Sequence, residues 1–198
     1  GRTRRILALV LRTLVFVCII CGLAEAQHTD PFTALTHAII SQQLSSKAGS
    51  TIAGRFDALC AGRPTPGAVA ALSDAQLRAA GLSGQKIRYM RDLCARVEDD
   101  SLPLHRLEAL TDAQVVEALT RVTGIGRWTA EMFLMFRLHR PDVLPVGDLG
   151  IVKAVQRAYR LRKIPSAARL EQIGEPWRPY RSVACWYLWA SLDNAPGA

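Results

Sequence analysis

The stretch Val122-Thr-Gly-Ile-Gly-Arg-Trp-Thr-Ala130 decides the fold, because it has the pattern of a tight turn between two helices. Gly124 and Gly126 are separated by one residue, so the backbone can turn there without a Cβ clash. We expect Ile125 to tuck between the flanking helices while the amides around both glycines project outward. Free amides at the positive end of a helix dipole favour phosphate. A simple glycine corner between two helices is the alternative interpretation of the two glycines alone.

Two capping boxes place this turn in a repeated unit. The segments Ser73–Gln76 and Thr111–Gln114 both have the spacing in which a Ser or Thr and a Gln satisfy free amides at a helix start. Each box opens a short helix that ends in a glycine turn, and a longer helix follows each turn. The sequence therefore predicts two helix–hairpin–helix units in tandem.

The remaining segments also have helical spacing of apolar residues, separated by Gly and Pro. The expected helices are residues 31–44, 46–59, 85–97, 127–139, 149–159 and 179–192, with a short piece after Pro165. No alternating β pattern of any length is present in the sequence. We predict an all-α fold of two lobes over residues 30–198, with the active site in the cleft between them. Residues 30–45 and about 140–198 are expected to form one lobe, and residues 46–139 the other.

The charge of the chain favours a polyanionic partner. Twenty-five Lys and Arg against 17 Asp and Glu give a net charge of +8, which favours nucleic acid first and an anionic membrane second. With 49% hydrophobic and 21% charged residues, wholesale disorder is excluded. Five cysteines without a second C-x-x-C, and four histidines without ligand spacing, argue against a zinc or iron–sulfur site. We expect Cys60, Cys94 and Cys185 to be buried as small apolar residues.

Residues 1–29 fit the rest of the sequence poorly. Arg2, Arg4 and Arg5 precede an apolar run that ends near Ala24-Glu25-Ala26, which is the pattern of a secretory signal. A membrane anchor, a leading helix and an atypical extension are alternatives, and the charge of Arg12 disfavours a membrane span.

Four blocks of sequence carry a resemblance to a known family. Residues 31–192 resemble the helix–hairpin–helix DNA glycosylases that have a Gly/Pro-rich loop followed by an aspartate (HhH-GPD), most of all the bacterial 3-methyladenine DNA glycosylase II branch. The blocks are Ile39–Ser45, Thr123–Glu131, Pro145–Gly150 and Arg178–Trp189. Thr123 departs from the pattern, since the family usually has proline there, and the change is expected to soften the hairpin without removing its amides.

The resemblance implies that Asp148 is the catalytic residue. A fixed carboxylate stabilises the positive charge that builds on deoxyribose when a glycosidic bond breaks, and it can also orient or deprotonate water. Without this context, an aspartate before a helix is more simply an N-cap. Relatives with lyase activity have a lysine nucleophile at the position of Trp128, and an indole cannot form a Schiff base. We therefore expect a monofunctional enzyme that leaves an abasic site.

The resemblance also assigns binding residues. A flipped base is held between aromatic or apolar walls, which match Trp128, Met132 and Trp189; ordinary core packing is expected for Trp177, Trp186 and Tyr187. The wedge that fills the gap in the duplex falls at Gln43, with a solvent-facing glutamine as the alternative. The expected DNA-binding residues are Gln43, Thr123, Gly124, Ile125, Gly126, Arg127 and Thr129, with Lys47, Arg88 and Lys153 left open as phosphate contacts.

These inferences predict a glycosylase of base excision repair that acts on alkylated purines in double-stranded DNA. We expect a cytoplasmic monomer that needs no cofactor and no obligate protein partner, with a monovalent cation possible at the hairpin backbone. Two alternatives remain at this stage: a glycosylase for deaminated or oxidised bases, and a non-catalytic DNA-binding module. The substitution Asp148→Asn separates the non-catalytic module from the two enzymes, because only an enzyme would lose base release.

Overall fold

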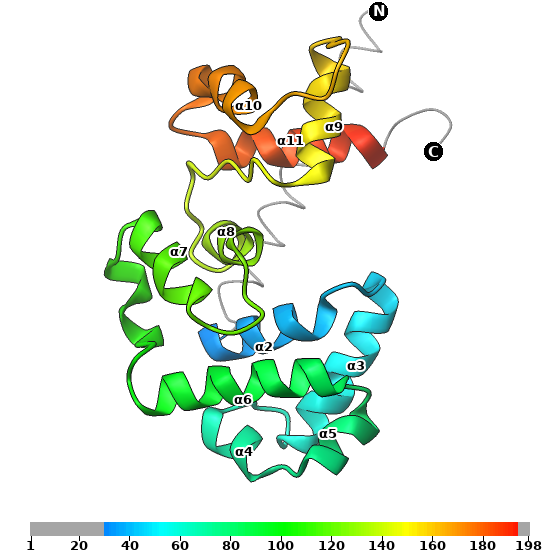
Figure 1. Ribbon diagram of the computed structural model, residues 1–198, viewed down its shortest axis with the longest axis vertical. Helices are drawn as coiled ribbons and strands as arrows, with labels where there is room; N and C mark the ends of the chain where they lie inside the picture. Colours follow the sequence, from blue (N-terminus) through cyan, green and yellow to red (C-terminus); the bar gives the residue numbers. More distant parts are fainter. Residues whose placement is uncertain (1–29, 194–198) are drawn as a thin grey trace, which may run out of the picture.

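The computed structural model describes residues 30–193, which form helices and no strand (Figure 1). The predicted export or anchor signal lies outside the described residues. The all-α prediction is confirmed. The α-helices are α2 (Pro31–Ser41), α3 (Ser46–Leu59), α4 (Pro66–Ala71), α5 (Asp74–Ala80), α6 (Gly84–Glu98), α7 (Asp112–Thr120), α8 (Arg127–Phe136), α9 (Leu149–Ala158), α10 (Ala167–Gly174) and α11 (Arg181–Asp193), and the 3-10 helices are η1 (Leu104–Ala109) and η2 (Glu175–Trp177). Among the described helices, none has the length and apolar character needed to cross a bilayer.

Side-chain caps fix most of the helix starts. Both predicted capping boxes form. Ser73 and Gln76 cap the start of α5, and Thr111 and Gln114 cap the start of α7. Two helices end earlier than the sequence predicts, α2 at Ser41 and α8 at Phe136. In each case a residue inside the expected range adopts a left-handed backbone, Gln43 at φ 58° and His139 at φ 52°, and a left-handed residue cannot continue a right-handed helix.

The helices form two groups with α8 between them (Figure 1). In one group α2 packs on α3, α6 and α8, α4 packs on α6, and α7 packs on α8. In the other group α9 packs on α11. The expected lobe boundaries placed residues 30–45 with residues 140–198, whereas α2 contacts helices of the first group. Its fully buried Leu35, Ile39 and Ile40 explain this position, since they need the apolar faces of those helices.

The return loop from α8 to α9 carries Asp148 and is held by the start of α11. Asp142 in this loop accepts hydrogen bonds from Arg181 Nε at 2.6 Å and from Arg178 Nη1 at 2.6 Å. Burial raises the pKa of Asp142, but the hydrogen bonds and charges of the two arginines outweigh it and hold the pKa below its usual value. Ser182 Oγ donates to the Arg140 carbonyl at 2.6 Å and accepts from the Val143 amide at 3.0 Å.

The three described cysteines are buried free thiols, as expected from the sequence. Burial raises the pKa of both Cys94 and Cys185 to about 12. A buried thiol with so high a pKa is inert as a nucleophile, which fits a packing role.

Removal of the Ser182 hydroxyl is expected to destabilise the fold. Ser182→Ala leaves the Val143 amide and the Arg140 carbonyl without this partner in a buried place, which costs about 1–3 kcal/mol. The measurement is the free energy of unfolding in urea. Ser191→Ala is the matched control on the same helix, because Ser191 is exposed and bonds only the Leu188 carbonyl. An equal loss in both variants would contradict the anchoring role of Ser182.

Candidate active site

The glycine turn between α7 and α8 has the tight geometry that the sequence predicts. Gly124 lies in the left-handed region at φ 86°, and the ring of Tyr89 occupies the space that a Cβ would need. Glycine is therefore required there both by the backbone and by the close approach of α6. Ile125 is 4% exposed, as expected for a side chain that tucks between the flanking helices. Its amide donates to the Val122 carbonyl at 3.0 Å, which closes the turn.

The two tandem units differ at the start of their long helices. In the first unit Ser83 caps α6 by accepting from the Lys86 amide at 3.3 Å. In the second unit Gly126 occupies the N-cap of α8 and provides no side-chain cap. The first-turn amides of α8 thus lack the side-chain acceptor that α6 has, and an uncapped helix start attracts an anion. Only the second unit has the open end that phosphate binding requires.

Asp92 of α6 holds the hairpin at the residue where the family pattern has proline. The Thr123 amide donates to Asp92 Oδ2 at 2.6 Å, and proline has no N–H that could do this. Arg96 Nε donates to the same carboxylate at 3.1 Å. Burial raises the pKa of Asp92, but these hydrogen bonds outweigh it, so the pKa lies below its usual 3.8.

The turn after α2 is tied to the hairpin. Gln42 Nε2 donates to the Gly124 carbonyl at 2.8 Å, and Lys86 Nζ donates to the carbonyls of Ile40 at 2.5 Å and Gln42 at 2.9 Å. These bonds place the exposed Gln43, the predicted wedge, directly beside the hairpin. Burial lowers the pKa of Lys86.

The carboxylate of Asp148 accepts three hydrogen bonds from three different helices. Asp148 caps α9, with Oδ1 accepting from the Ile151 amide at 2.8 Å. Oδ1 also accepts from Trp189 Nε1 of α11 at 3.0 Å, and Oδ2 accepts from Trp128 Nε1 of α8 at 2.8 Å. The N-cap and active-site interpretations of Asp148 are therefore compatible, because one oxygen makes the cap and both oxygens face indoles.

Two other aromatic side chains pack around Trp189. Phe136 stacks on Trp189 with ring centroids 6.1 Å apart, and Trp186 meets Phe136 edge-on at 5.2 Å. Trp128 is 48% exposed, so one indole of the pair is open to solvent. Of the three residues expected to pack in the core, Trp177 is partly buried against it, whereas Trp186 is half-buried in this aromatic cluster outside the core. Tyr187 is not a core residue, since it is 51% exposed.

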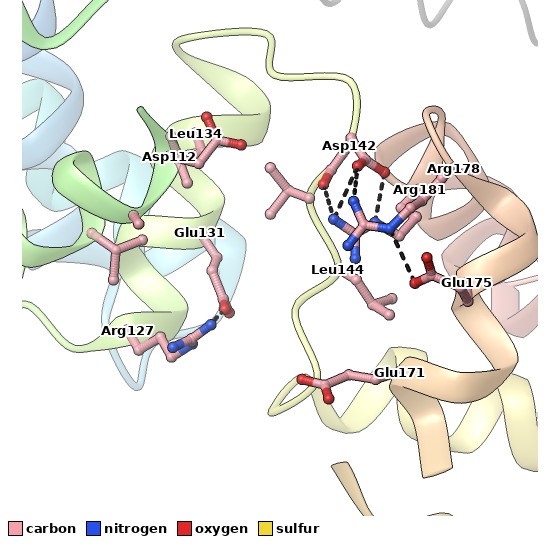
Figure 2. Close-up of a pocket in the computed structure, with 13 residues that line it drawn as sticks. Asp112, Arg127, Glu131, Leu134, Asp142, Leu144, Glu171, Glu175, Arg178 and Arg181 are labelled. Carbon is pink, nitrogen blue, oxygen red and sulfur yellow. Dashed lines mark hydrogen bonds and ion pairs between the residues drawn. The ribbon is translucent and has the colours of Figure 1, made fainter. Parts of the chain in front are cut away.

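Cavities lie on two sides of α8. One is a cleft of about 520 Å³ between the two helix groups, lined largely by charged side chains (Figure 2). There Arg127 Nε donates to Glu131 Oε1 at 2.8 Å, and burial raises the pKa of Glu131 against the opposing effect of Arg127. Neither Asp148 nor the two indoles line this cleft. The other is an apolar cavity of about 240 Å³ between α2 and α8, lined by Ala34, Ala38, Thr129, Met132, Phe133, Phe136 and Arg137.

The structure brings together most of the residues that the sequence singles out. Trp128 and Trp189 meet at Asp148, while Met132 lines the apolar cavity together with Phe136, the residue that stacks on Trp189. Sequence reasoning missed the Asp92 contact and the role of Phe136. Neither residue lies in a motif, and only the tertiary fold puts them beside the hairpin and Trp189. Among the described residues, no group of three or more His, Cys, Asp or Glu side chains is arranged to hold a metal ion.

Residues 36–179 match the family model of the HhH-GPD superfamily base excision DNA repair proteins. The chain belongs to this superfamily. The fold is similar to that of the DNA-3-methyladenine glycosidase from Bacillus halodurans, with 42% identity and a TM-score of 0.76 over 83% of this chain and 76% of that one. It is equally similar, at a TM-score of 0.76 and 35% identity, to the Schizosaccharomyces pombe 3-methyladenine DNA glycosylase in complex with abasic DNA, covering 85% of this chain and 84% of that one. The DNA-3-methyladenine glycosylase 1 of Schizosaccharomyces pombe is 36% identical over 84% of this chain and 74% of its own length.

The contact between Asp92 and the hairpin is expected to make stability depend on pH. A carboxyl whose pKa is depressed in the folded state stabilises the fold above its unfolded pKa, and this contribution is lost as pH falls through the folded value. Asp92→Asn is therefore expected to unfold more easily than the wild type at pH 7, by roughly 1 kcal/mol. The difference should shrink as the pH falls below 3.8. Urea unfolding at pH 7 and pH 3 measures both values.

Asp100→Asn is the control for this experiment. Asp100 is exposed and follows the end of the same helix, and Asn tolerates its left-handed backbone at φ 59°. Its free energy of unfolding should match that of the wild type at both pH values. A constant difference between Asp92→Asn and the wild type over this range would show that the Asp92 charge does not hold the hairpin.

Proposed function

We propose that this chain is a monofunctional DNA glycosylase of base excision repair. It flips an alkylated purine of the 3-methyladenine type out of duplex DNA and hydrolyses the glycosidic bond. Membership of the superfamily and the printed activities of the Bacillus halodurans and Schizosaccharomyces pombe relatives support the reaction class. The observation that carries the proposal is the carboxylate of Asp148, fixed by two indole N–H groups and one backbone amide.

Asp148 has the acceptor capacity that the reaction needs. A carboxylate has about four lone-pair sites, and Oδ1 uses two of them while Oδ2 uses one. The remaining site on Oδ2 faces the sugar or the attacking water. As the bond between C1′ and the base nitrogen breaks, its electron pair leaves with the base and positive charge builds on the sugar. Water then bonds to C1′ and gives its proton to the carboxylate.

The indoles both orient the carboxylate and form walls for the lesion. An alkylated purine is electron-poor or cationic, so a π face favours it over a normal base. Trp128 and Trp189 are these walls, and Met132 adds an apolar surface from the same helix as Trp128. The indole of Trp128 cannot form a Schiff base, so the product is an abasic site with an intact strand.

The hairpin and the turn after α2 bind the DNA around the flipped nucleotide. The uncapped amides at the start of α8 receive a phosphate, with Arg127 in the same turn, and a monovalent cation can share this site. The side chain of Thr129 is buried against the apolar cavity, so Thr129 contributes to this site through its backbone amide alone. Gln43 fills the gap that the flipped nucleotide leaves. The bond from Gln42 to the Gly124 carbonyl supports this arrangement, because it fixes the wedge relative to the phosphate site.

A panel of single-lesion duplexes tests the proposed function. Wild-type protein is expected to release 3-methyladenine from methylated duplex DNA, and Asp148→Asn is expected to reduce that rate by at least roughly a thousandfold. Asn is itself a good N-cap, so α9 should persist and DNA binding should remain. Asp30→Asn is the matched control, because Asp30 is also a capping aspartate, at the start of α2. Release only from uracil, hypoxanthine or oxidised guanine would reassign the substrate, and binding without release from any lesion would make the chain a non-catalytic module.

Loss of the Trp189 N–H is expected to affect turnover more than binding. Trp189→Phe keeps a ring that can stack on Phe136 but removes the donor to Asp148 Oδ1. We expect kcat to fall by about tenfold with little change in KM, because the carboxylate loses one of its three positioning bonds. Trp189→Leu, which also removes the ring, should raise KM in addition. Equal kinetic effects of both substitutions would show that Trp189 acts only through stacking.

A further inference from the structure

Five cations follow one another along α9 and the loop after it. Lys153, Arg157, Arg160, Arg162 and Lys163 are all exposed. Within the part of the chain that the structure describes, none of them forms an ion pair or a side-chain hydrogen bond. By contrast, Arg178 and Arg181 of the same helix group are both paired with Asp142. We call these five residues the cationic track.

The track begins beside the candidate active site. The buried face of α9 consists of Ile151, Val152, Ala154 and Val155. Leu149, the residue after Asp148, is 72% exposed. Lys153 and Arg157 follow Leu149 at steps of four residues, so all three share the exposed face of the helix. The active-site carboxylate is thus at one end of this face and the cations extend away from it.

The loop after α9 keeps the remaining cations close to the end of the helix. Arg160 adopts a left-handed backbone at φ 51°, and the Leu161 amide donates to the Gln156 carbonyl at 2.9 Å. This bond turns the chain back on the last turn of α9. Arg162 and Lys163 therefore continue the track from the helix end.

Helix electrostatics alone do not explain the track. A cation in the last turn of a helix interacts favourably with the dipole, which accounts for Arg157. Lys153 lies in the middle of α9, where the dipole gives no such gain, and Arg162 and Lys163 lie beyond the helix. Like charges four residues apart, as in Lys153 and Arg157, destabilise a helix. A polyanion along this face compensates that repulsion.

We propose that the cationic track binds the phosphates of the duplex on one side of the lesion, so that the DNA footprint extends asymmetrically along α9. This inference rests on the proposed function for the orientation of the DNA, whose flipped nucleotide is at Asp148. Ten helical residues span about 15 Å, which corresponds to roughly four to five base pairs at 3.4 Å each. Charge complementarity and continuity with the active site both favour DNA as the occupant.

The test uses three duplexes that contain a tetrahydrofuran abasic analogue. One has about twelve base pairs on both sides of the analogue, and in each of the other two one flank is trimmed to about three base pairs. The full 198-residue chain is expected to lose roughly tenfold in affinity when one flank is trimmed and little when the other is trimmed. Lys153→Gln with Arg157→Gln should bind the long duplex several-fold more weakly than the wild type does. This double variant should also lose less affinity than the wild type when that flank is trimmed, because two of the five cations are gone. Its salt dependence should also fall by roughly two phosphate contacts.

Arg63→Gln with Arg106→Gln is the matched control. Both arginines are exposed, neither is in an ion pair, and both lie in the other helix group, so the net charge changes equally. This control should keep the flank dependence of the wild type. Arg162→Gln with Arg160→Gln, in the loop where no helix is at risk, should weaken binding to the same flank. Equal losses in the α9 variant and the control, or a wild type that is indifferent to both flanks, would overturn the proposal.

Base release is measured in parallel, which separates the two proposals. If the wild type releases 3-methyladenine but shows no flank dependence, the proposal for the cationic track is wrong and the proposed function stands. If flank dependence is present and is reduced in the Lys153 and Arg157 variant while no lesion is released, the track proposal is supported and the catalytic proposal fails.

Discussion

The carboxylate of Asp148 is held by N–H donors from α8, α9 and α11, and the candidate site exists only while these three helices keep their relative positions. The bond from Trp128 joins the two helix groups, whereas the bonds from Ile151 and Trp189 lie within one group. A shift of about an ångström between the two helix groups therefore breaks the bond from Trp128 and leaves the bonds from Ile151 and Trp189 intact. The anchoring of the return loop by Ser182 and by the Asp142 ion pairs restrains this movement from the α11 side.

Helix α8 contributes to several parts of the molecule because its faces are chemically distinct. Arg127, Glu131 and Leu134 face the charged cleft, while Thr129, Met132 and Phe133 face the apolar cavity. Between these two faces Trp128 reaches Asp148. The raised pKa of Glu131 reflects its burial and, to a smaller degree, the nearby charge of Asp148. Its bond to Arg127 draws the guanidinium one turn along α8, into the charged cleft. One helix thus links the expected phosphate site to the carboxylate.

The sequence predicts the elements that depend on local chemistry and fails where distant contacts decide. The capping boxes, the glycine turn and the buried Ile125 follow from neighbouring residues, and the structure contains them. The early end of α2 and its packing on α3 and α6 do not follow, because tertiary contacts such as Lys86 to the Gln42 carbonyl hold the turn. The proposed catalytic role of Asp148 follows from the resemblance. The hydrogen bonds from its two indoles, which come from residues 20 and 41 positions away, follow only from the fold.

The change from proline to Thr123 shows how the chain replaces one kind of restraint by another. Proline limits the hairpin by reducing the conformations of the unfolded chain, an effect of about 0.4–1 kcal/mol. A threonine loses this entropic restraint but regains an N–H, and a hydrogen bond to a charged group contributes about 1.5–3 kcal/mol. The bond to Asp92 is therefore large enough to offset the missing ring. The softening expected from Thr123 therefore stays a prediction, and the restraint that opposes it depends on a carboxylate and on the ion pair with Arg96 that orients it.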